Sequence, residues 1–122
     1  MILITQNDFT ERTGIDLSAD VREDGITTDR QAQALIELWE KDVYEIAHRF
    51  NNCIDSDKLN EMQIEDIKQA VCGYGLMCWR KGYVKHDKDL YAIATEGAIQ
   101  TLRQHGIIVN GFKGTSGLRG GW

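Results

Sequence analysis

Proline is absent from the 122 residues, and cysteine and aromatic residues are scarce. A collagen-like triple helix is therefore excluded, although glycine is frequent near the carboxyl end. No apolar run approaches the roughly 18 residues that a membrane-spanning helix needs, so we expect no membrane association. The three cysteines, Cys53, Cys72 and Cys78, are odd in number and lack close paired spacing, so we expect reduced thiols.

The amino terminus shows no sign of a secretion signal. The opening MILITQNDF lacks a basic region and its apolar run is too short, so we expect synthesis and assembly in the cytoplasm. With 42% hydrophobic and 27% charged residues, the chain has the composition of an ordinary soluble protein. Its length predicts one globular domain.

Acidic residues outnumber basic ones, and the charge is unevenly distributed. Residues 1–60 carry 13 acids and 6 bases, a net of −7, whereas residues 61–122 carry 6 acids and 8 bases, a net of +2. This asymmetry would let one copy complement another, and scattered surface charge explains it equally well. A net charge of −5 argues against free DNA binding, which needs a concentrated basic face.

Apolar residues recur at steps of three or four, which predicts an all-α protein, a small bundle of about four helices. The first helix is short. A capping box of Thr5 and Asp8 begins it at about Gln6, and Gly14 ends it. We expect the following residues, 15–27, to form a polar loop.

The strongest helical pattern covers residues 29–50, after a second capping box formed by Thr28 and Gln31. Its apolar stripe consists of Ala32, Leu35, Trp39, Val43, Ile46 and Phe50. Leu38 and Tyr44 make the stripe wide enough to contact two neighbours. A solvated polar face is expected to carry Glu37, Glu40 and Glu45.

Two further helices are predicted over residues 61–82 and 87–105. The third helix has apolar positions at Ile64, Ile67, Val71, Tyr74 and Cys78. The fourth has them at Leu90, Ile93, Ala94, Ala98 and Leu102. Gly82 and Gly106 are the expected ends, because glycine favours the left-handed conformation that terminates a helix.

Gly73 and Gly75 interrupt the third helix, and each costs about 1 kcal/mol relative to alanine. Close approach of another helix, from the same chain or from a neighbouring copy, would offset this cost. The run GYGLMC lacks the third glycine and the preceding strand of a dinucleotide fingerprint. We therefore favour close packing over a ligand role.

No group of residues predicts catalysis, a metal site or a cofactor. Partners at metal or triad spacing are missing for His48, His86, His105, Cys72 and Cys78. We expect surface or capping roles for the histidines, and a buried apolar role for the two cysteines. The segment DSDKLNEMQIED fails as a calcium loop, because Leu59 replaces a ligand and Asn60 replaces the turn glycine.

A modest basic group lies between the third and fourth helices, next to Tyr83, and consists of Arg80, Lys81, Lys85 and Lys88. It is able to contact a nucleic-acid backbone, although an ordinary soluble surface explains it about as well. A small helical nucleic-acid-binding or regulatory protein is therefore one interpretation. An enzyme subunit whose active site a partner completes is another.

The carboxyl end differs from the rest. Residues 107–109 are β-prone, and glycine then recurs at every third position, which is typical of flexibility. It is no phosphate-binding loop, because Phe112 interrupts the required succession of glycine, lysine and serine or threonine. We divide the chain into a helical domain, 1–106, and a flexible partner-binding tail, 107–122, with a short β segment near 107–112.

The order of these features resembles one family, the head-to-tail connector, or adaptor (head completion), proteins of long-tailed bacteriophages and prophages. The likeness lies in a short capped helix like ITQNDFTERTGIDL, a long amphipathic helix like RQAQALIELWEKDVYEIAHRF, and a helix like IEDIKQAVCGYGLMCWRKG. A final segment is similar to EGAIQTLRQHGIIVNG. Together they span most of residues 1–110.

The resemblance implies a structural virion protein of the neck, assembled in the host cytoplasm, without enzymatic activity or cofactor. Its expected partners are the portal, neighbouring copies in a ring of about a dozen, and the next neck or tail component. DNA would pass through the ring without sequence-specific binding. We expect the tail to dock on the portal or an adjacent adaptor through Phe112, Lys113, Leu118, Arg119 and Trp122, as aromatic and arginine residues dominate interface hot spots. A terminus without function is the alternative.

Overall fold

The computed structural model describes residues 4–19, 21–22, 25–26, 28–50, 56–82 and 84–108. It confirms an all-α fold with four α-helices: α1 (Gln6–Thr13), α2 (Asp29–His48), α3 (Glu61–Lys81) and α4 (Lys88–Arg103). Two short 3₁₀ turns precede the last two helices: η1 (Ser56–Lys58) and η2 (Val84–His86). Each helix end lies within two residues of its predicted position.

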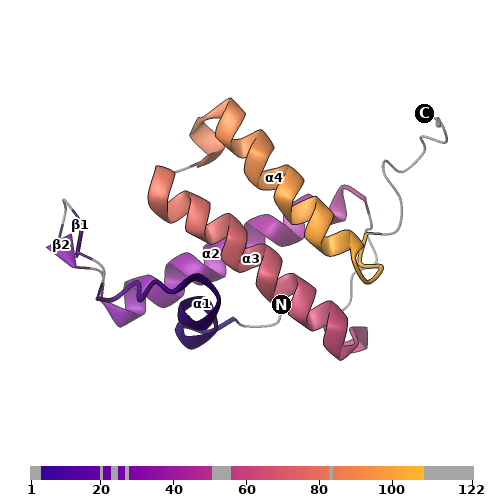
Figure 1. The fold of residues 1–122 in the computed structure, drawn as a ribbon, viewed down its shortest axis with the longest axis horizontal. Coiled ribbons are helices and arrows are strands. Elements are labelled where there is room, and N and C mark those ends of the chain that lie inside the picture. Colours follow the sequence, from indigo (N-terminus) through magenta and orange to yellow (C-terminus); the bar gives the residue numbers. More distant parts are fainter. Residues whose placement is uncertain are drawn as a thin grey trace.

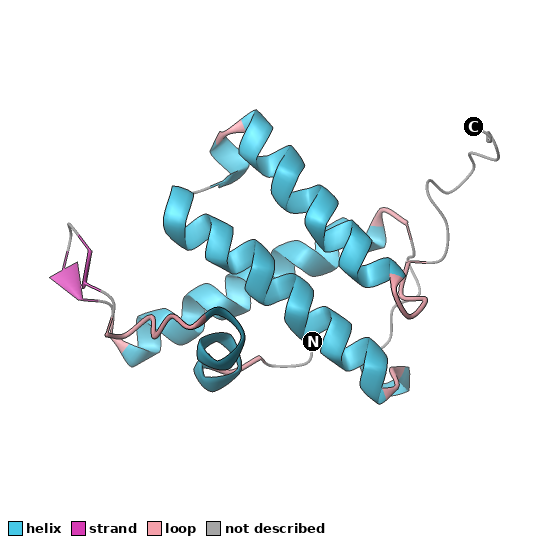
Figure 2. Cartoon of the chain, viewed as in Figure 1, coloured by secondary structure: helices cyan, strands magenta, loops and turns pink. Residues whose placement is uncertain are grey.

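The helices form two layers. α3 and α4 run antiparallel side by side, joined through η2, and α2 crosses behind α3 (Figures 1 and 2). The short α1 packs at one end against both α2 and α3. α2 contacts all three other helices, so packing within a single chain explains its apolar stripe apart from the exposed Leu38.

Side-chain caps begin each helix where the sequence places them. Capping boxes are present at Thr5 with Asp8, at Thr28 with Gln31, and at Asn60 with Gln63. The Asp87 carboxylate accepts from two backbone N–H groups at the start of α4. Each cap satisfies donors that the helix cannot, and is worth about 1 kcal/mol.

The segment predicted as a polar loop, 15–27, has more structure than expected. Val21–Arg22 (β1) and Gly25–Ile26 (β2) form a two-residue antiparallel pair that projects from the amino-terminal end of α2 (Figure 1). Two residues separate the strands, which is the spacing of a tight hairpin. Earlier in the segment, Leu17 is buried in the core. The buried side chain of Leu17 therefore holds the first part of this segment against the core.

The core contains most of the predicted apolar positions, with two corrections on polarity. Glu40, expected on a solvated face, is 0% exposed, and Asp42 of the same helix is also buried. Conversely Ile93, expected in the core of α4, is 60% exposed, and Leu38 on α2 is 40% exposed. Periodicity missed these four because it does not show how wide an arc of each helix the neighbours cover.

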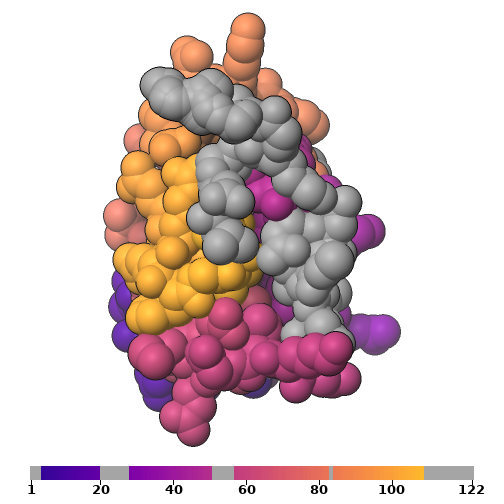
Figure 3. Space-filling model, turned by 90° about the vertical axis from the view of Figure 1, so that its right-hand side faces the viewer, coloured from indigo at the N-terminus to yellow at the C-terminus, as the bar shows by residue number. Residues whose placement is uncertain are grey.

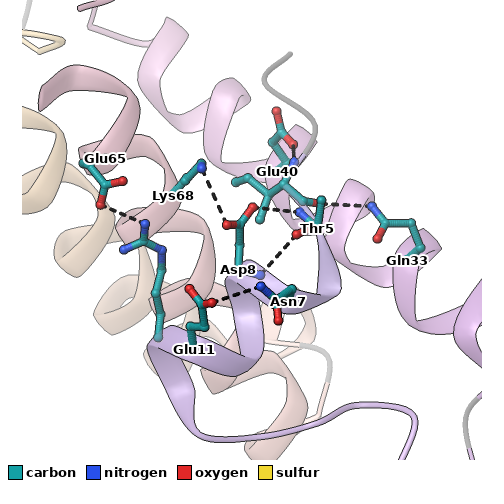
Figure 4. A network of polar contacts seen from close by, with 10 residues as sticks. Thr5, Asn7, Asp8, Glu11, Gln33, Glu40, Glu65 and Lys68 are labelled. Atoms are coloured by element: carbon teal, nitrogen blue, oxygen red, sulfur yellow. Dashed lines mark hydrogen bonds and ion pairs between the residues drawn. The ribbon is translucent and has the colours of Figure 1, made fainter. Parts of the chain in front are cut away.

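Glu40 is buried because it holds the amino-terminal segment. Its Oε1 atom accepts from the backbone N–H of Ile4 at 3.2 Å, and Gln33 Nε2 donates to the Ile4 carbonyl at 2.9 Å (Figure 4). Both polar groups of the Ile4 backbone are thereby satisfied while its side chain is fully buried. The segment before α1 is consequently fastened to α2.

Ion pairs fasten α1 to α3 on the outside. Arg12 Nη2 lies 2.8 Å from Glu65 Oε2, and Lys68 Nζ lies 3.5 Å from Asp8 Oδ1 (Figure 4). Burial alone would raise the pKa of Asp8. Hydrogen bonds from Thr5, together with the Lys68 charge, outweigh burial and hold this pKa below its ordinary value of 3.8.

The closest helix contact joins α2 to α3 at Gly75. A Cβ atom on Gly75 would lie 2.9 Å from Cδ2 of Trp39, and closer still to Cε3 of the same indole ring. The Trp39 ring also packs near Phe9, with ring centroids 5.5 Å apart. The predicted close packing is therefore confirmed for Gly75, whereas a Cβ on Gly73 would meet nothing within 4 Å.

We expect the two glycines of α3 to respond oppositely to alanine. Gly75→Ala should lower the free energy of unfolding by about 1 to 3 kcal/mol, because the added methyl group overpacks against Trp39. Gly73→Ala should raise it by up to about 1 kcal/mol, because alanine favours the helix and nothing obstructs it. Urea unfolding followed by circular dichroism measures both, and effects of the same sign would contradict the packing described.

Asp8 should make stability depend on pH in the acid range. Because its pKa is lowered in the folded protein, its ionised form stabilises the fold above about pH 3.8, and this contribution is lost as pH falls through the folded value. Asp8→Asn should therefore be less stable than the wild type at pH 7. The difference should shrink toward zero in strong acid, and a constant difference across the titration would refute this role.

Candidate functional site

The residues predicted to bind a partner lie beyond the described part of the chain. Phe112, Lys113, Leu118, Arg119 and Trp122 all follow Ile108, the last described residue. Ile107 and Ile108 are 2% and 1% exposed. These two residues belong to the core and not to the β segment predicted near 107–112, so the folded unit extends beyond residue 106. Residues 109–112 of that segment lie outside the described residues.

The point where the tail leaves the domain is held by several polar contacts. After α4 the chain turns at Gly106, whose φ of 84° suits glycine, and the Ile108 N–H donates to the Leu102 carbonyl at 3.0 Å. His105 Nδ1 lies 2.7 Å from the buried Asp66 carboxylate, and Gln63 Nε2 donates to the His105 carbonyl. The exit is thereby fixed against the amino-terminal part of α3 (Figure 3).

His105 therefore does more than the surface or capping role that its sequence position predicted. A carboxylate as buried as Asp66 needs a hydrogen-bonded partner, and the imidazole of His105 supplies one. Sequence spacing gave no signal for this pair, because 39 residues separate its members. The other two histidines, His48 and His86, are exposed, and His48 makes an edge contact with the Tyr44 ring.

The basic group is not uniformly available to a phosphate backbone. Lys85 Nζ lies 2.7 Å from Asp42 Oδ1 and 3.7 Å from Glu45 Oε2. Arg80, Lys81 and Lys88 are exposed, while Tyr83 lies outside the described residues. The pairing with two carboxylates reduces the positive potential that the group presents.

Asp42 is the centre of a buried polar network that joins α2, α3 and η2. Besides Lys85, it accepts from the hydroxyl of Tyr74 at 3.2 Å. Burial and the neighbouring Asp42 charge raise the pKa of Tyr74, so the phenol stays protonated and donates at neutral pH. The polar groups of Asp42, Tyr74 and Lys85 thus have hydrogen-bonding or ionic partners within this network, which connects the three elements.

The two described cysteines are buried and free, as the sequence predicts. Burial raises the pKa of Cys72 to about 11 and also raises that of Cys78, so both remain thiols at neutral pH. The thiolate is the reactive form, and neither side chain provides it. Cys53 lies outside the described residues.

The surface of the described helices is hollowed between α3 and α4. The hollow has a volume of about 230 Å³, and its lining includes Gly73, Ile93, Ala94, Gly97, Ala98 and Thr101. Four of these residues are glycine or alanine, whose small side chains leave the space open. Ile93, also part of the lining, is exposed. The apolar periodicity of α4 predicted Ile93 in the core and gave no sign of this surface, although Gly73 and Gly97 in mid-helix were a usable signal.

Among the described residues there is neither a metal-binding cluster nor a membrane-crossing helix. Within them, no three His, Cys, Asp or Glu side chains come together in a way that could hold a metal ion. Measured against the length and hydropathy of a bilayer-crossing segment, every described helix falls short.

Comparison with known proteins identified no relatives. The sequence matches no known protein family, and neither a curated protein nor a solved structure is significantly similar to it.

We expect Cys72 and Cys78 to resist alkylation in the folded protein. Iodoacetamide at neutral pH should leave both unmodified for hours, because burial and a raised pKa deny the reagent a thiolate. In denaturant both should react completely. Both cysteines lie in one tryptic peptide, residues 69–80, so tandem mass spectrometry of that peptide assigns the modified position. Rapid labelling of either cysteine in the native chain would contradict its burial.

Proposed function

We propose that this chain is a structural adaptor of a long-tailed bacteriophage or prophage, forming a ring of about a dozen copies beneath the capsid portal. The observation that carries the proposal is the order and size of the four capped helices. They occur at the places on which the family resemblance depends. Helical periodicity is common in proteins, so the proposal relies on the whole sequence of elements and not on any one of them.

The exposed apolar side chains are consistent with lateral packing in such a ring. Leu38 of α2, Met62 of α3 and Ile93 of α4 are all substantially exposed. In a cyclic assembly one face of a subunit meets a different face of the next, so each copy needs apolar contacts on more than one surface. Three exposed residues on three helices provide them.

Charge fits the passage of DNA through the ring. Residues 1–60 have a net charge of −7 and the whole chain −5. A channel wall of like sign repels the phosphate backbone, so exiting DNA does not adhere to it. DNA is thus a passenger in this proposal, without sequence-specific contact.

The tail supplies attachment to the portal or to an adjacent adaptor. Ordering each residue of a glycine-rich segment costs roughly 1 to 2 kcal/mol, so apolar and charged anchors must offset that cost. Phe112, Leu118 and Trp122 are the apolar anchors, and Lys113 and Arg119 pair with acidic sites. The fixed exit at Ile108 gives these anchors a defined starting point on the domain.

A small nucleic-acid-binding or regulatory protein is the rival interpretation. It depends on the basic group at the end of α3, and the pairing of Lys85 with Asp42 and Glu45 weakens that group. A salt-dependent gel shift with duplex DNA would favour the rival. Electron microscopy of the protein mixed with its cognate portal, showing a portal-dependent ring, would favour the adaptor.

Deletion of residues 111–122 should separate folding from assembly. Thermal unfolding should be nearly unchanged, because the described core ends at Ile108, whereas assembly on the portal should be lost with the anchors. The matched control is Thr115→Ala with Ser116→Ala, which retains every anchor and should assemble normally. Normal assembly by the truncated protein would refute the role given to the tail.

A further inference from the structure

The hollow between α3 and α4 is kept open by two glycines that the chain's own packing does not require. A Cβ atom on Gly73 or Gly97 would meet nothing within 4 Å. Each glycine nevertheless costs about 1 kcal/mol in the middle of a helix. Gly75 differs, because Trp39 occupies the space where its side chain would be. The missing side chains at Gly73 and Gly97 therefore leave room for a group from outside the described bundle.

The size of the hollow suits a side chain better than a small metabolite. Its volume is about 230 Å³, whereas small-molecule sites are typically about 300 to 1,000 Å³. The wall is apolar on the α4 side, where Ile93, Ala94 and Ala98 contribute to it. One large apolar or aromatic residue of a partner is the matching occupant.

Acidic residues flank the hollow on α4. Asp89 and Glu96 are exposed, and they lie four residues before and three residues after Ile93, so all three share one face of the helix. Glu96 Oε1 accepts from Gln100 Nε2, which keeps the carboxylate on that face. A partner segment that joins an apolar residue to a basic one would complement this surface.

We propose that the hollow is the docking site for the carboxyl-terminal tail of a second copy of this chain. Phe112 of one copy fills the hollow of the next, and the adjoining Lys113 pairs with Glu96. The tail contains Lys113 and Arg119 and, from residue 109 on, no acidic side chain, so its charge is opposite to that of the flanking residues. This inference deepens the proposed function, because a tail seated on its neighbour would link successive adaptors.

Charge disfavours one simpler arrangement. Pairing this face with itself about a two-fold axis would bring the acidic flanks of both copies together, which is unfavourable. Docking within one copy is the competing arrangement, because Thr101 brings the hollow close to the end of α4 where the tail begins. Only docking between copies produces a heterodimer from two complementary variants, so the experiment below separates the two arrangements.

Complementation between two full-length variants tests the proposal. One variant has a filled hollow, Gly97→Leu, with an intact tail. The other has a disabled tail, Phe112→Ser with Lys113→Glu, and an intact hollow. We expect the wild type to self-associate, each variant alone to associate at least tenfold more weakly, and an equimolar mixture to form a heterodimer in native mass spectrometry. Circular dichroism should show all of them folded, because Gly97 has open space for a side chain.

Charge reversal supplies an independent readout. Glu96→Lys should weaken self-association and Lys113→Glu should do the same, whereas mixing the two variants should restore it. A wild type that stays monomeric up to about 1 mM, the weak limit of specific binding, would overturn the proposal. Undiminished association of Gly97→Leu, or failure of the variant mixture to form a heterodimer, would also overturn it.

Failure of the docking proposal can be distinguished from failure of the proposed adaptor function. If the variants complement one another but the wild type forms no ring with a portal, the docking stands and the adaptor function fails. If Gly97→Leu forms a portal-dependent ring as well as the wild type does, the adaptor function stands and the docking fails.

Discussion

The contact between Trp39 and Gly75 determines how the rest of the molecule is arranged. The indole ring lies where a side chain on Gly75 would be, so α2 and α3 approach closely at the centre of the fold. Phe9 packs near the same ring and thereby places α1 in the angle between them. With that pair fixed, α4 covers the remaining side of α2 and α3 and completes the core. A large aromatic residue and a glycine thus set the spacing that the other side chains fill.

Three buried carboxylates then fasten the segments that have no helical packing of their own. Glu40 holds the backbone before α1, Asp42 holds the connector that contains Lys85, and Asp66 holds the turn after α4 through His105. Burying a carboxylate is unfavourable unless it is hydrogen-bonded, so each acid selects one arrangement of its segment. The two ends of the described part, Ile4 and Ile108, are consequently positioned relative to the bundle.

The same packing leaves the outer face between α3 and α4 uncovered. An exposed Ile93, two glycines without an internal partner and a flanking pair of acids occur there together. The proposed ring and the proposed seat for a neighbouring tail are two levels of one hypothesis, in which assembly and not chemistry is the function.

The helices could be predicted from the sequence, because capping boxes, glycine stops and 3.6-residue periodicity are local signals that operate before any tertiary contact. Close packing was predicted at both glycines of α3 and is confirmed for Gly75 but not for Gly73, while Cys72 and Cys78 are the buried thiols expected. Which face of each helix is covered follows from the tertiary packing alone. For this reason Glu40 is buried where the sequence predicted exposure, and Ile93 is exposed where it predicted burial. Burial depends on the neighbours that a helix meets and not on its own pattern. The Asp66–His105 pair and the hollow arise in the same way, from residues far apart in the chain that the fold of the bundle brings together.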